Sequence, residues 1–164
     1  MNNLILIRHG QSIWNLERRF TGWADVDLTD HGKSEAKYAG QLIKKLNIEF
    51  DVYFTSVQIR AIDTLEIILD ILNKKNSEIK KAWELNERHY GALTGLNKDE
   101  MMKKLGKKQV HIFRRSWNVP PPTMKKTHPN HPSKNKTYIN IPTDKMPDSE
   151  SLKNTFERVM PYYE

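Results

Sequence analysis

The feature that most constrains the fold is an alternation of short strand-like runs with longer amphipathic stretches. Residues 4–7 and 51–55 are buried-strand candidates, and residues 81–86 form a third candidate strand. Between them, apolar residues recur at helical spacing from Ala36 to Leu46 and across residues 57–74, which predicts two helices. Strand–helix–strand connections of this length favour right-handed crossovers. We therefore expect an α/β protein built on a mostly parallel sheet.

The stretches outside this alternation contain turn formers, another helix and many prolines. Residues 16–32 are rich in turn formers, and either Thr29 or Asp30 is placed to cap the helix that follows. The pattern of residues 98–116 predicts a further helix. Residues 118–147 contain seven prolines and few apolar residues, so we expect a long irregular loop or lid there.

Length and composition indicate one soluble domain over residues 1–164. Hydrophobic residues make up 37% of the chain and charged residues 29%. The last amphipathic piece, residues 150–159, is expected to stop at Met160-Pro161. No apolar run is long enough to cross a bilayer, and no signal peptide is visible. The sequence contains no cysteine, which excludes disulfide and thiolate chemistry and fits a cytoplasmic protein.

The net charge of +7 raises the alternative of a nucleic-acid-binding protein. Much of the excess comes from scattered lysine pairs, and neither an RNA-binding signature nor a zinc-finger pattern accompanies them. An anionic small molecule explains the arginines better, because arginine binds phosphate and carboxylate groups bidentately.

Polar residues that could take part in catalysis or ligand binding follow each predicted strand. Arg8-His9 ends the first strand, Arg60 comes shortly after the second, and Glu87 follows the third. Parallel strands bring their carboxyl ends to one rim of the sheet. There a neutral His9 is a competent nucleophile toward phosphorus, and Glu87 is a candidate general acid or base. Gly10 allows a sharp turn and leaves room for a group to approach the imidazole.

Each of these residues also has a purely structural interpretation. Arg60 would serve equally to cap a carbonyl group or to pair with Asp63, and Glu87-Arg88 would be an ordinary exposed pair. Arg114-Arg115 would be a solvated helix face. Taken jointly with Arg-His-Gly, however, the active-site interpretation is favoured.

Four segments are similar to the histidine phosphatase superfamily, and specifically to its 2,3-bisphosphoglycerate-dependent phosphoglycerate mutases. They are Arg8 to Asn15, Arg19 to Trp23, Glu84 to Lys98 and Arg114 to Pro122. Arg-His-Gly alone would indicate the broad superfamily, whereas the last two segments are far more specific. The resemblance covers essentially the whole chain and implies the three-layer α/β/α fold of that superfamily.

The resemblance implies interconversion of 3-phosphoglycerate and 2-phosphoglycerate through a phosphohistidine enzyme of glycolysis and gluconeogenesis. It assigns His9 as the phosphoryl carrier, primed by the cofactor 2,3-bisphosphoglycerate, and Glu87 as the proton donor and acceptor, with no metal. Arg8 and Arg60 are implied to act in catalysis and in binding. The further substrate-binding residues are Gly10, Gln11, Ser12, Asn15, Thr21, Gly22, Arg88, His89, Tyr90, Lys98, Arg114 and Arg115. Gln11 stands where many relatives have glutamate.

One departure concerns a second catalytic histidine, which the family carries in a strand–His-Gly segment nearer its carboxyl end. None of the other five histidines here follows an apolar strand, and the sequence stops at Glu164, before that segment would begin. The missing strand lies beside the first one in the family, so residues 4–7 would form an unpaired apolar edge. We therefore expect the C-terminal strands to be absent. The chain is then either a fragment of a longer protein or a poorly active protein that tends to aggregate.

Four hypotheses about function follow. The first is a mutase or its amino-terminal portion. The second is a phosphatase in which water takes the phosphoryl group from His9. The third is an inactive binder of phosphate ligands or protein partners, and the fourth is a basic nucleic-acid binder. The expected partner is a small phosphoglycerate, without nucleic acid or membrane, and the family analogy suggests a homodimer or tetramer.

Overall fold

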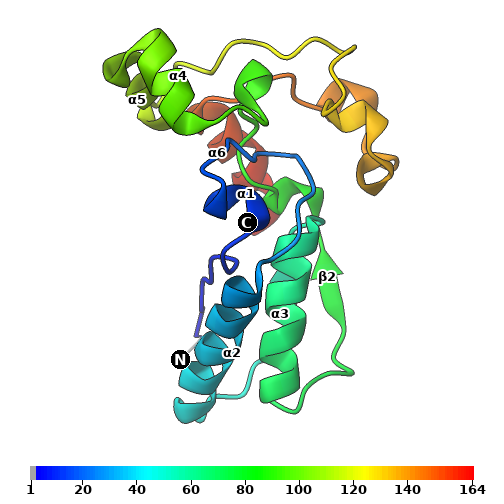
Figure 1. Ribbon diagram of the computed structural model, residues 1–164. Coiled ribbons are helices and arrows are strands. Elements are labelled where there is room, and N and C mark those ends of the chain that lie inside the picture. The colour runs from blue at the N-terminus through cyan, green and yellow to red at the C-terminus, as the bar shows by residue number, and fades with distance from the viewer. Residues whose placement is uncertain (1–2) are drawn as a thin grey trace.

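The computed structural model describes residues 3–164, in which helices predominate over a small parallel sheet (Figure 1). The α-helices are α1 (Ile13–Leu16), α2 (Asp30–Lys45), α3 (Ile59–Ile71), α4 (Lys98–Leu105), α5 (Lys107–Arg115) and α6 (Leu152–Tyr163). The strands are β1 (Tyr53–Thr55) and β2 (Ile79–Lys81). Short 3-10 helices are η1 (Trp83–Leu85), η2 (Gly91–Leu93), η3 (Pro132–Lys134), η4 (Lys136–Tyr138) and η5 (Thr143–Lys145).

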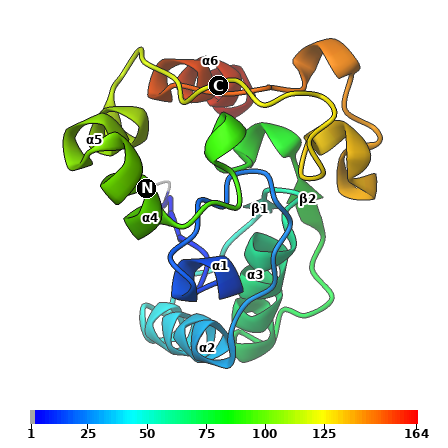
Figure 2. The same cartoon turned by 45° about the horizontal axis from the view of Figure 1, so that its top comes forward.

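The predicted β–α–β unit is confirmed in β1, α3 and β2. The two strands pair in parallel, with Tyr53 opposite Ile79, and α3 connects them beside α2. Thr29 is the N-cap of α2, where its hydroxyl oxygen accepts a hydrogen bond from the Gly32 N–H. Figure 2 shows α3 and α6 on opposite sides of the strands, and the Tyr162 ring of α6 meets Phe54 of β1 edge-on at 6.1 Å. The α/β class is therefore confirmed.

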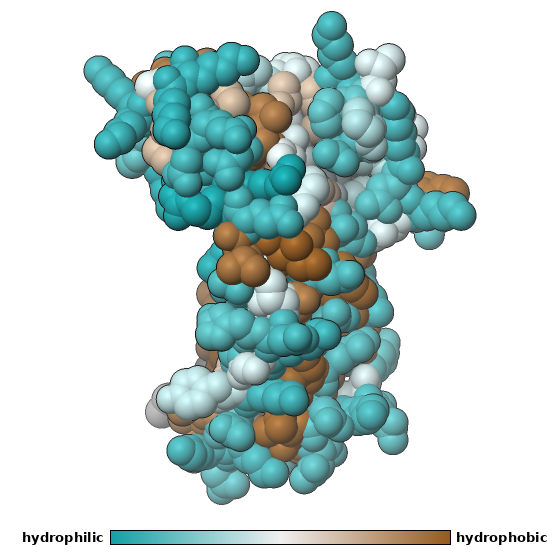
Figure 3. Space-filling model, in the orientation of Figure 1, coloured by the Kyte–Doolittle hydropathy of each residue, from teal (hydrophilic) through white to brown (hydrophobic). Residues whose placement is uncertain are grey.

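The prediction of a first strand at residues 4–7 is wrong. Residues 4–7 form no strand in the described chain, and Leu6 is 84% exposed. An apolar run becomes a buried strand only when a neighbouring strand takes its backbone hydrogen bonds, and within residues 3–164 none does so. Figure 3 shows hydrophobic surface across the middle of the molecule, between more polar upper and lower parts.

Three other element boundaries differ from the predictions. The strand that follows α3 is β2 at Ile79–Lys81, so the strand expected at 81–86 shares only Lys81 with it, and Trp83–Leu85 form η1 instead. The helix predicted over residues 98–116 is broken into α4 and α5 at Gly106, whose φ of +86° is a conformation that glycine adopts readily. Helix α6 continues past Pro161, because a proline in the last turn removes little of the hydrogen-bond ladder.

The proline-rich segment 118–147 is packed onto the protein rather than being an open lid. Tyr138 is fully buried against Trp23, and its hydroxyl group donates a 2.7 Å hydrogen bond to the Trp23 carbonyl oxygen. Ile141 joins this cluster, and Met124 is buried as well. A separate apolar cluster of Phe20, Leu93, Met101 and Val110 supports α4 and α5.

No helix within residues 3–164 has the length and apolar character that a membrane crossing requires.

Candidate active site

The segment that carries His9 is held by helices instead of by a sheet. The Gly10 N–H donates to the Thr64 hydroxyl oxygen on α3 at 3.1 Å. A Cβ atom on Gly10 would lie 2.2 Å from the carbonyl oxygen of Gly32 on α2, so this approach requires glycine. The sequence predicted a sharp turn at Gly10, but the structure shows that close contact with α2 explains this glycine better.

The His9 imidazole is arranged to present one nitrogen as a nucleophile. Its Nδ1 atom lies 2.6 Å from the Gly10 carbonyl oxygen, which fixes the proton on Nδ1 and leaves the lone pair on Nε2. Burial lowers the pKa of His9 to about 4; the Arg60 and Arg8 charges add to this effect, while the Gly10 carbonyl opposes it. At neutral pH the ring is therefore uncharged, which is the form that attacks phosphorus.

Arg60 connects His9 to Glu87. Its guanidinium group is fully buried, and Nε donates to Nε2 of His9 at 3.3 Å. Nη2 lies 3.0 Å from a carboxylate oxygen of Glu87. Further bonds to the carbonyl oxygens of Gly22 and Ala24, at 2.8 and 3.0 Å, hold the group in one orientation. The structure thus brings together three residues that are far apart in the sequence, at positions 9, 60 and 87.

Glu87 is placed by a glutamine that the sequence analysis did not identify. The Glu87 side chain follows η1 and is 34% exposed, so a ligand can reach it. Its backbone N–H donates to the amide oxygen of Gln58 at 3.2 Å, and the Gln58 side chain also bonds Arg60 and Gly22. The only sign of Gln58 in the sequence was a polar residue two positions before Arg60. A polar residue at the start of a helix does not by itself indicate a functional role.

Arg88, Lys98 and Arg114 form a second group of cationic residues. Arg88 is buried, donates to the Arg114 carbonyl oxygen at 2.8 Å and stacks 4.8 Å from the Tyr90 ring centroid. Burial lowers the pKa of Lys98, and the Arg114 charge lowers it further, whereas Glu87 opposes this. Within residues 3–164, Nη1 of Arg88 and Nε of Arg114 are buried without hydrogen-bond partners. Anionic groups would satisfy these donors.

The side chains of several predicted binding residues form hydrogen bonds within the protein. Ser12 and Asn15 form the capping box of α1, each side chain accepting a hydrogen bond from the other's backbone N–H. The Gln11 side chain accepts from the Thr29 hydroxyl group at 3.0 Å. The hydroxyl oxygen of Thr21 is buried and finds no partner among residues 3–164, so it is a candidate ligand contact.

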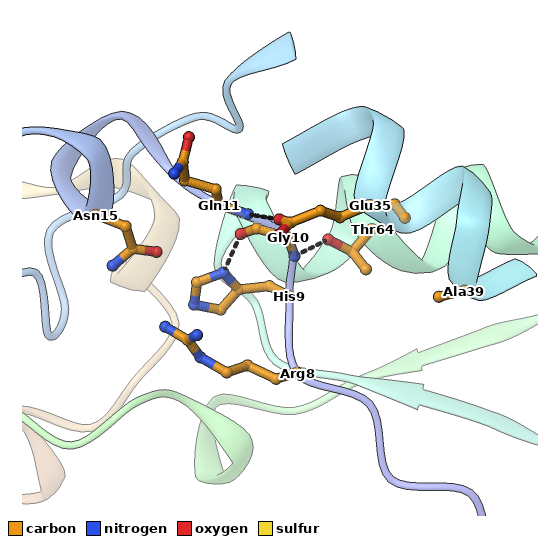
Figure 4. A pocket seen from close by; sticks show the side chains of 9 residues that line it. Arg8, His9, Gly10, Gln11, Asn15, Glu35, Ala39 and Thr64 are labelled. Atoms are coloured by element: carbon orange, nitrogen blue, oxygen red, sulfur yellow. Dashed lines mark hydrogen bonds between the residues drawn. The ribbon is translucent and has the colours of Figure 1, made fainter. Parts of the chain in front are cut away.

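A cavity of about 410 Å³ opens beside His9 (Figure 4). Figure 4 shows the Arg8 and Asn15 side chains on the same side of the backbone as the His9 imidazole, whereas Ala39 and Thr64 lie on the other side. The cavity is lined by Arg8, His9, Gly10, Gln11, Asn15, Glu35, Ala36, Ala39 and Thr64.

Two further predicted binding residues, His89 and Arg115, do not line the cavity beside His9. His89 is fully buried against the Trp23 ring, and its Nδ1 atom accepts from the Gly91 N–H at 2.9 Å. Burial lowers the pKa of His89 to about 4, and the nearby His131 adds to this effect. His89 is therefore packed in the interior, and its Nε2 atom is buried without a hydrogen-bond partner among residues 3–164. Arg115 lies exposed in the last turn of α5.

A buried ion pair supports the Glu87 segment from α6, and sequence analysis missed it. Arg158 binds Glu150 through two bonds of 2.7 and 2.9 Å, and both side chains are almost fully buried. Arg158 also donates to the carbonyl oxygens of Glu84 and Asn86, while Glu150 accepts from the His89 N–H at 2.8 Å. These contacts hold the segment from both sides of Glu87.

Known proteins match this chain along most of its length. The model of the histidine phosphatase superfamily (branch 1) matches residues 4–130. A relative from Pelagibacter ubique, named 2,3-bisphosphoglycerate-dependent phosphoglycerate mutase, is 56% identical over 99% of this chain and 68% of its own length. A relative of the same name from Hydrogenobaculum is 53% identical over 100% of this chain and 66% of its own length. The chain thus spans about two thirds of the length of these relatives.

Solved structures share the fold. A mycobacterial hydrolase matches with a TM-score of 0.68 at 19% identity, over 94% of this chain and 60% of that one. The phosphoglycerate mutase from Bacillus anthracis matches with a TM-score of 0.57 at 27% identity, over 66% of this chain and 49% of that one. With the family model and the curated relatives, this places the chain in the histidine phosphatase superfamily and, within it, among the 2,3-bisphosphoglycerate-dependent phosphoglycerate mutases.

Proposed function

We propose that this chain interconverts 3-phosphoglycerate and 2-phosphoglycerate by way of a phosphohistidine at His9. The observation that carries the proposal is the single Arg60 guanidinium group, which bonds the free nitrogen of His9 and the carboxylate of Glu87 at once. A nucleophile, a fixed positive charge and an acid–base group therefore lie within one hydrogen-bonded unit. That combination is what phosphoryl transfer to and from a hydroxyl group requires.

In the proposed transfer, Nε2 of His9 forms a bond to phosphorus as the phosphorus–oxygen bond of the donor breaks. Glu87 in its acid form gives a proton to the leaving oxygen, and in the return step it takes a proton from the accepting hydroxyl group. The 3.3 Å bond from Arg60 to Nε2 is long and easily displaced by an entering phosphoryl group. Arg60 then faces that group and stabilises its charge.

The cationic residues fit the cofactor 2,3-bisphosphoglycerate, which supplies the priming phosphoryl group when bound. Its phosphates and carboxylate need several fixed donors, and the buried, unpartnered nitrogens of Arg88 and Arg114 are donors of this kind. We propose that Arg88, Lys98 and Arg114 hold the anionic groups remote from His9. Arg8 and Asn15 line the cavity next to the imidazole and serve the transferring group.

The experiment that tests this proposal follows the products by phosphorus NMR. The purified chain is incubated with 3-phosphoglycerate and catalytic 2,3-bisphosphoglycerate, and Glu87→Gln is the matched variant. Appearance of 2-phosphoglycerate in the wild type, with a loss of about 10²- to 10⁴-fold in the variant, supports the mutase. Inorganic phosphate as the sole product would instead indicate a phosphatase, and the absence of both products would contradict catalysis by this chain.

We propose further that residues 1–164 belong to a single mutase-like catalytic domain that is incomplete at its C-terminus, and that the protein is cytoplasmic. A homodimer or tetramer is proposed by analogy with the family, and light scattering of the purified chain measures it. A mass equal to one chain of 19.3 kDa would contradict that assembly.

A further inference from the structure

Gln58 is a fully buried polar side chain that bonds two residues of the proposed site, Arg60 and Glu87. It is 2% exposed and stands at the N-cap of α3, where its side chain makes no cap hydrogen bond. Instead its Nε2 atom donates to the Gly22 carbonyl oxygen at 2.8 Å. Its Oε1 atom accepts from Nη2 of Arg60 at 2.9 Å and from the Glu87 N–H at 3.2 Å.

These partners determine the orientation of the amide. The oxygen faces two donors and the nitrogen faces one acceptor, so a flipped amide would set its NH₂ group against two other donors. A buried amide with every contact on the site is costly unless all its bonds form. A purely apolar residue would fill the same space with less dependence on its neighbours.

Nη2 of Arg60 has fewer N–H protons than it has acceptors around it. Nη2 of a guanidinium group carries two N–H bonds. Three oxygens surround Nη2 here: the Gly22 carbonyl at 2.8 Å, Oε1 of Gln58 at 2.9 Å and the Glu87 carboxylate at 3.0 Å. Gln58 therefore competes with the Glu87 carboxylate for the N–H protons on Nη2 of Arg60.

We propose, on the basis of the function proposed above, that Gln58 is a positioning residue for the acid–base step. It anchors the Glu87 backbone and withholds part of the Arg60 hydrogen bonding from the Glu87 carboxylate. A carboxylate that received both Nη2 protons would be stabilised in its charged form and would give up its acid role.

The other charged and titratable groups around Glu87 are the same in the wild type and in the two Gln58 variants used as a test. Arg60 faces it from α3, Lys98 from α4 and Tyr138 from η4, and His9 lies beyond Arg60. Gln58→Met and Gln58→Glu change none of these groups. The first variant removes the competing oxygen at similar volume, and the second keeps it but adds a negative charge beside Glu87.

The test follows the pH at which the Glu87 carboxyl group titrates, by ¹³C NMR of the full chain, with Glu87→Gln to assign the signal. We expect the midpoint to move to lower pH in Gln58→Met and to higher pH in Gln58→Glu. Ile68→Val, a buried change on α3 away from the site, should leave it unmoved. Midpoints that stay at the wild-type value, or that move in the same direction in both variants, would overturn the proposal.

A kinetic measurement separates this proposal from the function on which it rests. The rate of acid-labile phosphate incorporation from 2,3-bisphosphoglycerate should fall about 10- to 100-fold in both variants at neutral pH, and its pH profile should shift in opposite directions. Opposite NMR shifts without any labelling of the wild type would support the role of Gln58 and refute the proposed function. Should Gln58→Met fail to fold, an unmoved or lowered midpoint in Gln58→Glu alone overturns the proposal.

Discussion

Replacing Arg158 by methionine should remove a large part of the stability of this protein. The substitution leaves the Glu150 carboxylate, whose side chain is 4% exposed, without its charged partner. Breaking a buried ion pair by removing one partner typically costs about 3–5 kcal/mol. The carbonyl oxygens of Glu84 and Asn86 also lose a charged donor.

Urea unfolding followed by the fluorescence of the four tryptophans measures this cost. With a denaturant slope of about 2 kcal/mol per molar, the midpoint of Arg158→Met should fall by roughly 2 M. The control is Lys153→Met on the same helix, which breaks an exposed pair with Glu157 and should cost less than about 1 kcal/mol. Adding Glu150→Gln to Arg158→Met should recover part of the loss, because the buried charge disappears.

A urea midpoint that falls no more in Arg158→Met than in Lys153→Met would contradict this prediction. A double variant that is less stable than Arg158→Met alone would contradict it as well. Either result would mean that the Arg158–Glu150 pair does not hold the Glu87 segment in place.

Three further predictions concern other parts of the site. Burial lowers the pKa of His89 from 6.5 to about 4, so its contribution to stability is complete above pH 6.5 and is lost as pH falls toward 4. His89 should account for about 2 kcal/mol of the stability lost between pH 7 and pH 5, and His9, whose pKa is lowered likewise, for a similar amount; in urea titrations His89→Asn should therefore roughly halve the pH dependence, and an unchanged dependence would contradict this. Gly10→Ala should lower stability by about 1–3 kcal/mol, because the new Cβ meets the Gly32 carbonyl group, and thermal unfolding at the wild-type midpoint would contradict this. Arg60→Lys should slow phosphate incorporation at His9 by at least about tenfold, because an ammonium group cannot bond His9 and Glu87 with one planar fork, and wild-type rates in rapid-quench assays would count against it.

The helices and their order could be predicted from local pattern, because their signals lie close together in the sequence. Thr29 caps α2 as expected, and the apolar spacing across residues 57–74 became α3. Residues 4–7 failed as a strand because a strand depends on a partner elsewhere in the chain. The break at Gly106 depended on a single backbone conformation that periodicity does not reveal.

The candidate catalytic residues could be grouped from the sequence, whereas the residues that support them could not. The expected convergence of three parallel strand ends grouped His9, Arg60 and Glu87 correctly, although only the strand that precedes Arg60 forms at its predicted place. Gln58 looks like an ordinary helix-start residue until its contacts with Gly22 and Glu87 are seen. His89 sits inside a motif of ligand-binding residues, and only burial shows that it faces the interior.

The central claim is that the imidazole of His9 carries a phosphoryl group. Incubating the chain with radiolabelled 2,3-bisphosphoglycerate, quenching in alkali and mapping the peptide that contains the label tests it most directly, with His9→Ala as the matched variant. We expect label that is lost in acid, located at His9 and absent from the variant. Equal labelling of the two proteins, or label on another residue, would contradict the account.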